Sequence, residues 1–169
     1  DEKVGYITSC PTNIGTGMRA SVMLHLPALS LTNQAEKILL AASQLGVAVR
    51  GVYGEGTKSM GNLYQISNQG TLGASEEKII DKINKITMQI VEKEKSTRKN
   101  LMINNKTALE DKIYRSFGIL NNARIISTQE AMKLISNVKL GIELGTLKDL
   151  RSTELDILIT EIQPYNIQY

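Results

Sequence analysis

A chain of 169 residues, 41% of them hydrophobic, is long enough for one domain with an appendage and short for two full domains. Its 20 Lys and Arg residues nearly balance 17 Asp and Glu residues, and a net charge of +3 does not indicate a broad binding surface for nucleic acid or a membrane. No apolar run approaches the roughly 20 residues of a membrane span, and one cysteine cannot form an internal disulfide, so we expect a cytoplasmic protein without nucleic-acid or membrane partners.

Glycine content changes near residue 70. Nine of the 13 glycines fall at or before Gly70, whereas the stretch after Gly73 is charged and apolar at helical spacing. The chain also begins without Met and enters a strand-like run almost at once. We therefore expect a piece of a longer protein, made of two differently built parts.

The first part opens with two expected strands. Residues 4–9 (VGYITS) and 20–26 (ASVMLHL) are rich in strand-forming residues, and Pro27 ends the second run. Side chains alternate between the two faces of a strand. One face of the second strand therefore carries Ala20, Val22, Leu24 and Leu26, and the other carries Ser21, Met23 and His25.

A helix and two more strands follow. Residues 28–46 have apolar positions at helical spacing, and Gly46 provides a C-terminal stop. Residues 47–53 (VAVRGVY) and 63–69 (LYQISNQ) predict strands on either side of a glycine-containing loop. Because this order is not the strict alternation of a parallel α/β sheet, we expect an α+β fold whose antiparallel or mixed sheet has helices on one side.

The second part is expected to be helical. Residues 75–104 begin with a serine ahead of two glutamates and predict a long helix with one apolar stripe, made of Ile79, Ile83, Ile86 and Ile90. Residues 108–120 repeat apolar side chains every three or four positions. Residues 127–144 do the same after a capping box formed by Ser127 and Glu130.

A glycine-rich loop and two arginines are the candidate site. The loop CPTNIGTGMR runs from Cys10 to Arg19, and its two glycines permit close approach of a ligand, although a plain connection between strands has a similar composition. Arg19 and Arg50 are the only arginines among the first 70 residues, and each lies at a strand end beside glycine. Their guanidinium groups could clamp nucleotide phosphates or make structural ion pairs. Glu55, in the sequence GEG, is a candidate base or only a turn residue.

Other kinds of site are disfavoured. The stretch GVYGEGTKS resembles a P-loop, but Thr57 follows Gly56 where that motif needs lysine. A nucleophilic Cys10 activated by histidine is also disfavoured, because His25 is the only histidine that could act as its partner. Too few ligands are present for a zinc site, so we expect no metal held by the protein alone.

Three stretches occur together in a known enzyme family. GYITSCPTNIGTGMRASVMLHLPAL, VRGVYGEG and YQISN closely resemble the catalytic domain of the ATP:guanido phosphotransferases, the family of creatine and arginine kinases. This resemblance extends from about Val4 to Lys95. Beyond it, LEDKIYRSFGIL, ARIIS and VKLGIELG are similar to the helical extension of the bacterial protein-arginine kinases.

The resemblance implies a division of the chain. Residues 1–100 would be part of a phosphagen kinase-type catalytic domain, and residues 101–169 a helical C-terminal extension. The family's N-terminal domain, further arginines and a second active-site carboxylate would lie upstream of Asp1, and a phosphoarginine-binding segment would lie beyond Tyr169. We therefore expect the isolated chain to be inactive.

Roles for individual residues follow from the same resemblance. Arg19 and Arg50 would contact the phosphates of ATP bound with Mg²⁺, while Glu55 would hold and activate the acceptor guanidinium. Cys10 would lie beside that guanidinium. In phosphoryl transfer such groups act by alignment and by stabilising charge in the transition state.

Two positions depart from the metabolic kinases. Those enzymes have histidine near the adenine at the position of Met23, and aspartate at the position of Gln65. We expect the nucleotide contacts at these two positions to differ.

The resemblance favours an ATP-dependent kinase of arginine side chains in proteins, active in a stress response. Its implied partners are substrate proteins, including a stress-response repressor, and indirectly a Clp-type protease system. One alternative is a metabolic phosphagen kinase acting on a small guanidine. Another is a non-catalytic binding or dimerisation module that forms a homodimer through its helices.

Overall fold

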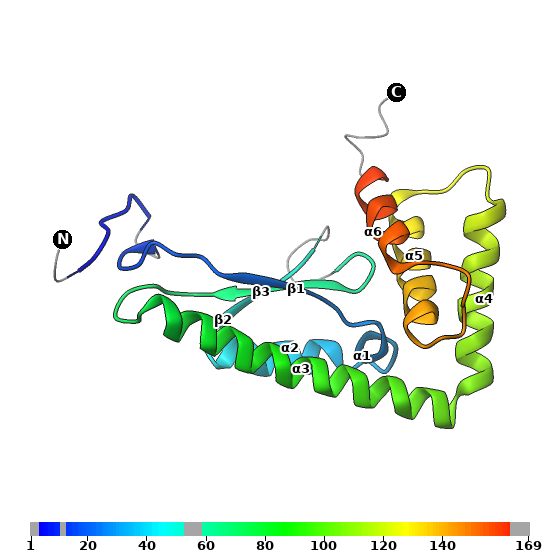
Figure 1. Ribbon diagram of the computed structural model, residues 1–169, viewed down its shortest axis with the longest axis horizontal. Coiled ribbons are helices and arrows are strands. Elements are labelled where there is room, and N and C mark those ends of the chain that lie inside the picture. The colour runs from blue at the N-terminus through cyan, green and yellow to red at the C-terminus, as the bar shows by residue number, and fades with distance from the viewer. Residues whose placement is uncertain (1–3, 11–12, 53–58, 163–169) are drawn as a thin grey trace. The chain divides into compact units, whose positions relative to one another are not determined.

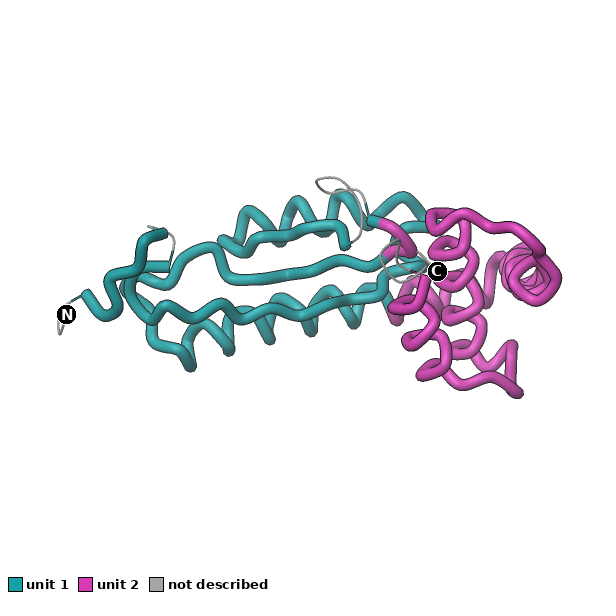
Figure 2. Tube along the Cα trace, turned by 90° about the horizontal axis from the view of Figure 1, so that it is seen from above, with its two compact units in different colours: residues 1–59, 63–94 teal, residues 60–62, 95–169 magenta. Residues whose placement is uncertain are grey.

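The computed structural model describes residues 4–10, 13–52 and 59–162. Its helices and strands, shown in Figure 1, are β1 Ser21–His25, α1 Pro27–Leu31, α2 Ala35–Gln44, β2 Val47–Gly51, β3 Leu63–Asn68, α3 Glu76–Asn104, α4 Lys106–Asn122, α5 Thr128–Glu143 and α6 Ser152–Glu161. The chain divides into two compact units (Figure 2). Unit 1 comprises residues 1–59 and 63–94, and unit 2 comprises residues 60–62 and 95–169.

Unit 1 is built on a three-stranded antiparallel sheet with strand order β1-β3-β2. β3 is central, so Gln65 pairs with Met23 of β1 on one side and with Arg50 of β2 on the other. The expected strands at 20–26, 47–53 and 63–69 are confirmed with slightly shorter bounds. The α+β fold with an antiparallel sheet is confirmed as well.

The expected strand over residues 4–9 is wrong. An isolated bridge joins Tyr6 to Gly15, with Tyr6 N donating to Gly15 O at 2.7 Å and Gly15 N donating to Tyr6 O at 3.1 Å. Gly5 has a φ of +80°, which interrupts the extended backbone that continuous strand pairing requires. Ile7 is 76% exposed, so no core holds this segment as a strand.

The expected helix over residues 28–46 is two helices, α1 and α2. Between them the hydroxyl of Thr32 donates to the carbonyl of Ala28 at 2.9 Å, and Asn33 adopts a φ of +57°. Threonine and asparagine side chains compete for the backbone groups of a helix, and asparagine tolerates the left-handed region, so the first helix ends here. Gly46, with a φ of +79°, follows α2 as a predicted stop.

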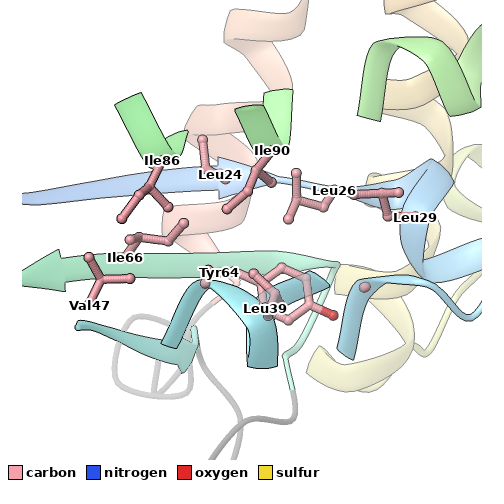
Figure 3. Close-up of a cluster of buried hydrophobic side chains, with 11 residues drawn as sticks. Leu24, Leu26, Leu29, Leu39, Val47, Tyr64, Ile66, Ile86 and Ile90 are labelled. Carbon is pink, nitrogen blue, oxygen red and sulfur yellow. The ribbon is translucent and has the colours of Figure 1, made fainter. Parts of the chain in front are cut away.

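The helices of unit 1 pack against one face of the sheet. Figure 3 shows the resulting core, which contains Leu24, Leu26, Leu29, Leu39, Val47, Tyr64, Ile66, Ile86 and Ile90. All four isoleucines of the predicted α3 stripe are buried, and so are Leu24 and Leu26 on the predicted apolar face of β1. Met23, on the opposite face, is 57% exposed. Burial of this apolar area is the main favourable term in folding unit 1.

A buried carboxylate on α3 caps α1. The two carboxylate oxygens of Glu94 accept hydrogen bonds from Ala28 N at 3.0 Å and Leu29 N at 2.9 Å, and Glu94 is 3% exposed. The first N–H groups of a helix have no partner within that helix, and the N-cap residue Leu26 has no side chain that could accept from them. Glu94 therefore supplies the cap from a distant part of the sequence.

We expect Glu94→Gln to lower the free energy of unfolding of this chain by about 1–3 kcal/mol. The amide keeps one acceptor oxygen but turns an N–H₂ donor toward the second backbone N–H, which leaves that buried group unsatisfied. Urea unfolding checks this, with Glu76→Gln at the exposed start of α3 as the matched control. Equal midpoints for the two variants would contradict the capping role.

Unit 2 is a helical assembly in which α5 packs against α4 and α6. A Cβ added to Gly141 of α5 would lie 2.4 Å from Ile113 Cγ2 of α4, so a glycine permits the close approach of these helices. The predicted cap of α5 is confirmed, because Ser127 Oγ accepts from Glu130 N at 3.2 Å. Helix α6 was not predicted from the sequence.

The positive charge of Lys112 on α4 destabilises the folded chain. Its pKa lies below the ordinary value of 10.5 because burial disfavours the charged amine and because Lys133 of α5 adds repulsion. In the folded chain Lys112 therefore loses its proton at a lower pH than in the unfolded chain. The resulting loss of folding stability is fully present at pH values below the pKa of Lys112 in the folded chain. Stability is regained as the pH rises through that pKa.

We expect Lys112→Met to raise the melting temperature of the chain slightly at neutral pH, since methionine keeps the apolar stem without the charge. The gain should shrink as the pH approaches 10.5. Thermal melts at several pH values check this, with Lys99→Met at an exposed position of α3 as the control. A gain that does not change with pH would attribute the effect to packing alone.

Candidate functional site

Arg19 and Arg50 lie on the same face of the sheet, opposite the core. Arg50 of β2 pairs with Gln65 of β3, whose neighbours along the strand, Tyr64 and Ile66, belong to the core. By alternation Gln65 and Arg50 therefore face away from the core. Arg19 precedes β1, and its Nη2 donates to Ser67 Oγ at 3.3 Å, on the same face as Gln65. We call this the open face of the sheet.

The two guanidinium groups lack acidic partners within the described part of the chain. Arg19 is exposed, and its one hydrogen bond described there is to the neutral hydroxyl of Ser67. Arg50 is exposed, and its side chain has neither an ion pair nor a hydrogen bond to another described residue. The alternative that each arginine makes a structural ion pair thus finds no support among these residues. Two positive charges on one face, without acidic partners among the described residues, favour an anionic ligand.

The strand order sets the spacing of the two arginines. Arg50 shares a cross-strand row with Met23, which lies four residues beyond Arg19. With strands about 4.8 Å apart and about 3.3 Å per residue, the two Cα atoms are roughly 16 Å apart. Long side chains reaching inward from both positions can meet an anion that lies over β3, whereas short side chains could not.

Met23 and Gln65, the two positions expected to differ from the metabolic kinases, lie in one cross-strand row with Arg50. Met23 pairs directly with Gln65, and Gln65 pairs with Arg50, so the three side chains form one row across the open face. A change at either position therefore alters the surroundings of the other. The row combines an apolar side chain, an amide and a cation.

Cys10 lies on the loop that the bridge between Tyr6 and Gly15 closes. It is an exposed cysteine that is not part of a disulfide, and its carbonyl accepts from Thr8 Oγ1 at 2.7 Å and from Asn13 N at 3.0 Å. This exposure leaves the residue accessible to a ligand.

Glu55 lies outside the described residues. The described chain leaves β2 through Val52, whose N donates to Leu63 O at 2.9 Å, and resumes at Ser59. The structure therefore does not test the role expected for Glu55.

Within the described residues, no three histidine, cysteine, aspartate or glutamate side chains come together as a metal-binding group. The helices among them also include none that is long and apolar enough to cross a membrane.

Sequence reasoning missed the residues that hold Arg19 in place. Ser67 and Asn68, consecutive at the end of β3, contact its guanidinium and its flanking backbone. Both lie in the stretch YQISN that carries the family resemblance. Residue patterns did not indicate their partners, because Arg19 and Ala20 each lie 48 residues away along the chain.

Two family models together account for nearly the whole chain. Residues 1–97 match the model of the ATP:guanido phosphotransferase C-terminal catalytic domain. Residues 106–169 match the model of the protein-arginine kinase McsB C-terminal domain. The boundary between the two matches falls at the end of α3.

Curated relatives match over almost the full chain. The protein-arginine kinase of Clostridium kluyveri is 53% identical over 168 residues, which are 99% of this chain and 49% of that protein. The protein-arginine kinase of Bacillus pumilus is 55% identical over 99% of this chain and 46% of its own length, and that of Bacillus subtilis is 51% identical over the same shares. The chain thus spans about half the length of the curated relatives it matches.

Solved structures of metabolic kinases also resemble part of the chain. A substrate-free duplicated taurocyamine kinase from Schistosoma mansoni is 35% identical with a TM-score of 0.45, over 56% of this chain and 12% of that one. A lombricine kinase is 34% identical with a TM-score of 0.46, over 55% of this chain and 25% of that one.

Proposed function

The chain belongs to the ATP:guanido phosphotransferase family, and from that membership we propose that the intact protein transfers the γ-phosphoryl group of ATP to the guanidinium of arginine residues in proteins. One observation carries the choice of acceptor. Residues 106–169 match the C-terminal domain model of a protein-arginine kinase, and relatives of that name are 51–55% identical over the chain. This second match favours arginine in proteins over free arginine as the acceptor.

In this proposal Arg19 and Arg50 bind the phosphates of the nucleotide. Their positions on either side of β3, without acidic partners among the described residues, support a bound polyanion. As the terminal phosphoryl group moves, negative charge spreads over its oxygens, and a fixed guanidinium fork stabilises that charge. Mg²⁺ entering with ATP would supply further positive charge at the phosphates that Arg19 and Arg50 would hold.

Glu55 and Cys10 would act on the acceptor. A carboxylate orients the guanidinium and accepts its proton as the N–P bond forms. A thiolate at Cys10, on an exposed loop ahead of Arg19, would add negative charge beside the acceptor. Phosphorylation of an arginine thus needs cations at the donor and anions at the acceptor.

The proposal extends to the cellular setting. We place the enzyme in the cytoplasm during a stress response, with arginine-bearing proteins as substrates, among them a repressor, and with a Clp-type protease acting downstream. A homodimer is the proposed assembly. The similarity to protein-arginine kinases over 99% of the chain supports this placement.

The test is phosphorylation by the intact parent protein. Purified parent, ATP and Mg²⁺ are incubated with an arginine-rich protein or with free arginine, and mass spectrometry locates the phosphate. We expect phosphoarginine in the protein and little modification of free arginine. Phosphorylation of free arginine alone would favour the metabolic alternative, and absence of both products would leave a non-catalytic binding module.

A further inference from the structure

The side chain of Asn68, at the end of β3, contacts the backbone on both sides of Arg19. Its Oδ1 accepts from Ala20 N at 2.9 Å, and its Nδ2 donates to Met18 O at 3.0 Å. Nδ2 also donates to Gly70 O at 3.3 Å. The amide therefore uses its acceptor and its donors at once.

These contacts fix the conformation of Arg19. The carbonyl of Met18 and the N–H of Ala20 belong to the two peptide groups that flank the Arg19 Cα atom. A peptide group is planar, so holding both groups restricts the two backbone dihedrals of Arg19. The guanidinium end is held separately, by the hydrogen bond from Nη2 to Ser67 Oγ at 3.3 Å.

Strand pairing alone does not supply this restraint. β1 begins at Ser21, so Arg19 lies before the paired strand, in a segment that contains Gly17 at a φ of +64°. Glycine gives such a segment conformational freedom, which would spread the guanidinium over many positions. An amide that clamps the backbone of Arg19 offsets that freedom.

The connection after β3 holds the earlier part of the same loop. Thr71 Oγ1 donates to Ile14 O at 2.6 Å, and Thr16 N donates to Thr71 O at 3.5 Å. Gly15 packs so closely here that a Cβ on it would lie 2.6 Å from Thr71 O. The segment from Asn68 to Thr71 thus supports residues 14–20, which lead to and flank Arg19.

We propose that Asn68 is a positioning residue, which presents the Arg19 guanidinium to the phosphates of the nucleotide without touching the nucleotide itself. This inference rests on the proposed role of Arg19 as a phosphate ligand. Preorganised donors stabilise a transition state because little reorganisation is needed when the charge develops. Asn68 supplies that preorganisation through the backbone.

The experiment is a double-mutant cycle in the intact parent. Asn68→Ala, Arg19→Ala and the double variant are compared with the wild-type protein for the Kd of ADP by calorimetry, for kcat and KM, and for melting temperature. We expect Asn68→Ala to weaken ADP binding about tenfold and to lower kcat. In the Arg19→Ala background the same change should have almost no further effect on ADP binding, because the two residues act as one unit.

Two further variants separate positioning from folding. Asn68→Ser keeps a small polar side chain and provides the readout if the alanine variant does not fold. Asn137→Ala is the matched control, since Asn137 is a buried asparagine of unit 2 whose Nδ2 donates to Ser116 Oγ at 2.9 Å. It should lower the melting temperature without changing the Kd of ADP.

Three results would overturn the inference: an unchanged Kd in a folded Asn68 variant, effects of Asn68→Ala and Arg19→Ala that add fully, or nucleotide binding that does not need Arg19. The proposed function fails on a different measurement, namely the absence of phosphoarginine in protein substrates. A parent protein that binds ADP but phosphorylates no arginine would still report the coupling between Asn68 and Arg19.

Discussion

Replacing Arg50 with lysine in the intact protein is expected to lower kcat/KM for protein phosphorylation by about 10²- to 10³-fold, the scale of removing one preorganised donor. Lysine keeps the positive charge but loses the planar fork that matches two phosphate oxygens. Arg50 is exposed and pairs with no other described residue through its side chain, so folding should not suffer. Arg19→Lys should cause a similar loss and also remove the hydrogen bond to Ser67.

The measurement is steady-state kinetics together with a thermal melt. Arg115→Lys is the matched control, because Arg115 is an exposed arginine of α4 in unit 2 whose Nε donates to Asp111 at 2.8 Å. It should leave kcat/KM unchanged. An Arg50→Lys enzyme with wild-type kinetics would remove Arg50 from the phosphate site.

The sequence predicted the elements in which one periodicity dominates. Alternation along 20–26 separated the buried Leu24 from the exposed Met23, and the four isoleucines of the predicted α3 stripe are all buried. The side chain of Ser127 accepts from Glu130 N, as the capping box requires. In each case the decisive interactions are local, so spacing alone carries the information.

The elements that were not predicted correctly depend on interactions that the spacing of apolar residues does not reveal. Residues 152–161 (STELDILITE) bury no side chain fully, and their apolar residues are confined to positions 155 and 157–159, which is too short a pattern to indicate a helical period. The break before α2 depends on whether Thr32 bonds to the backbone or continues the helix. At 4–9 the strand-forming residues lack a continuous partner within the described chain.

The candidate site was predicted residue by residue but not as an arrangement. Sequence placed Arg19 and Arg50 at strand ends, while the strand order β1-β3-β2 places them on either side of β3. Strand order depends on residues far apart in the sequence, and the residues around each arginine do not predict it. The same holds for Asn68, which contacts Ala20 across 48 positions.

Glu55→Gln in the intact protein is expected to lower kcat by about 10²- to 10⁴-fold, the range typical of losing a general base. Glutamine has the shape of glutamate but cannot accept the proton of the guanidinium, and it replaces a charge-assisted contact by a neutral one. ATP affinity should stay near the wild-type value, because the phosphates are assigned to Arg19 and Arg50. The melting temperature should also stay close to that of the wild type if the charge serves the acceptor and not the fold.

Three measurements on one variant separate the alternatives for Glu55. They are kcat with a protein substrate, the Kd of ATP and the melting temperature, with Glu36→Gln at an exposed position of α2 as the control. A loss confined to kcat assigns Glu55 to the acceptor guanidinium. Near-normal turnover would leave it as a turn residue of the GEG sequence, and a large drop in melting temperature would make it structural. A weakened ATP affinity with normal kcat would place Glu55 on the nucleotide side of the reaction, because losing a base for the acceptor slows the chemical step without weakening ATP binding.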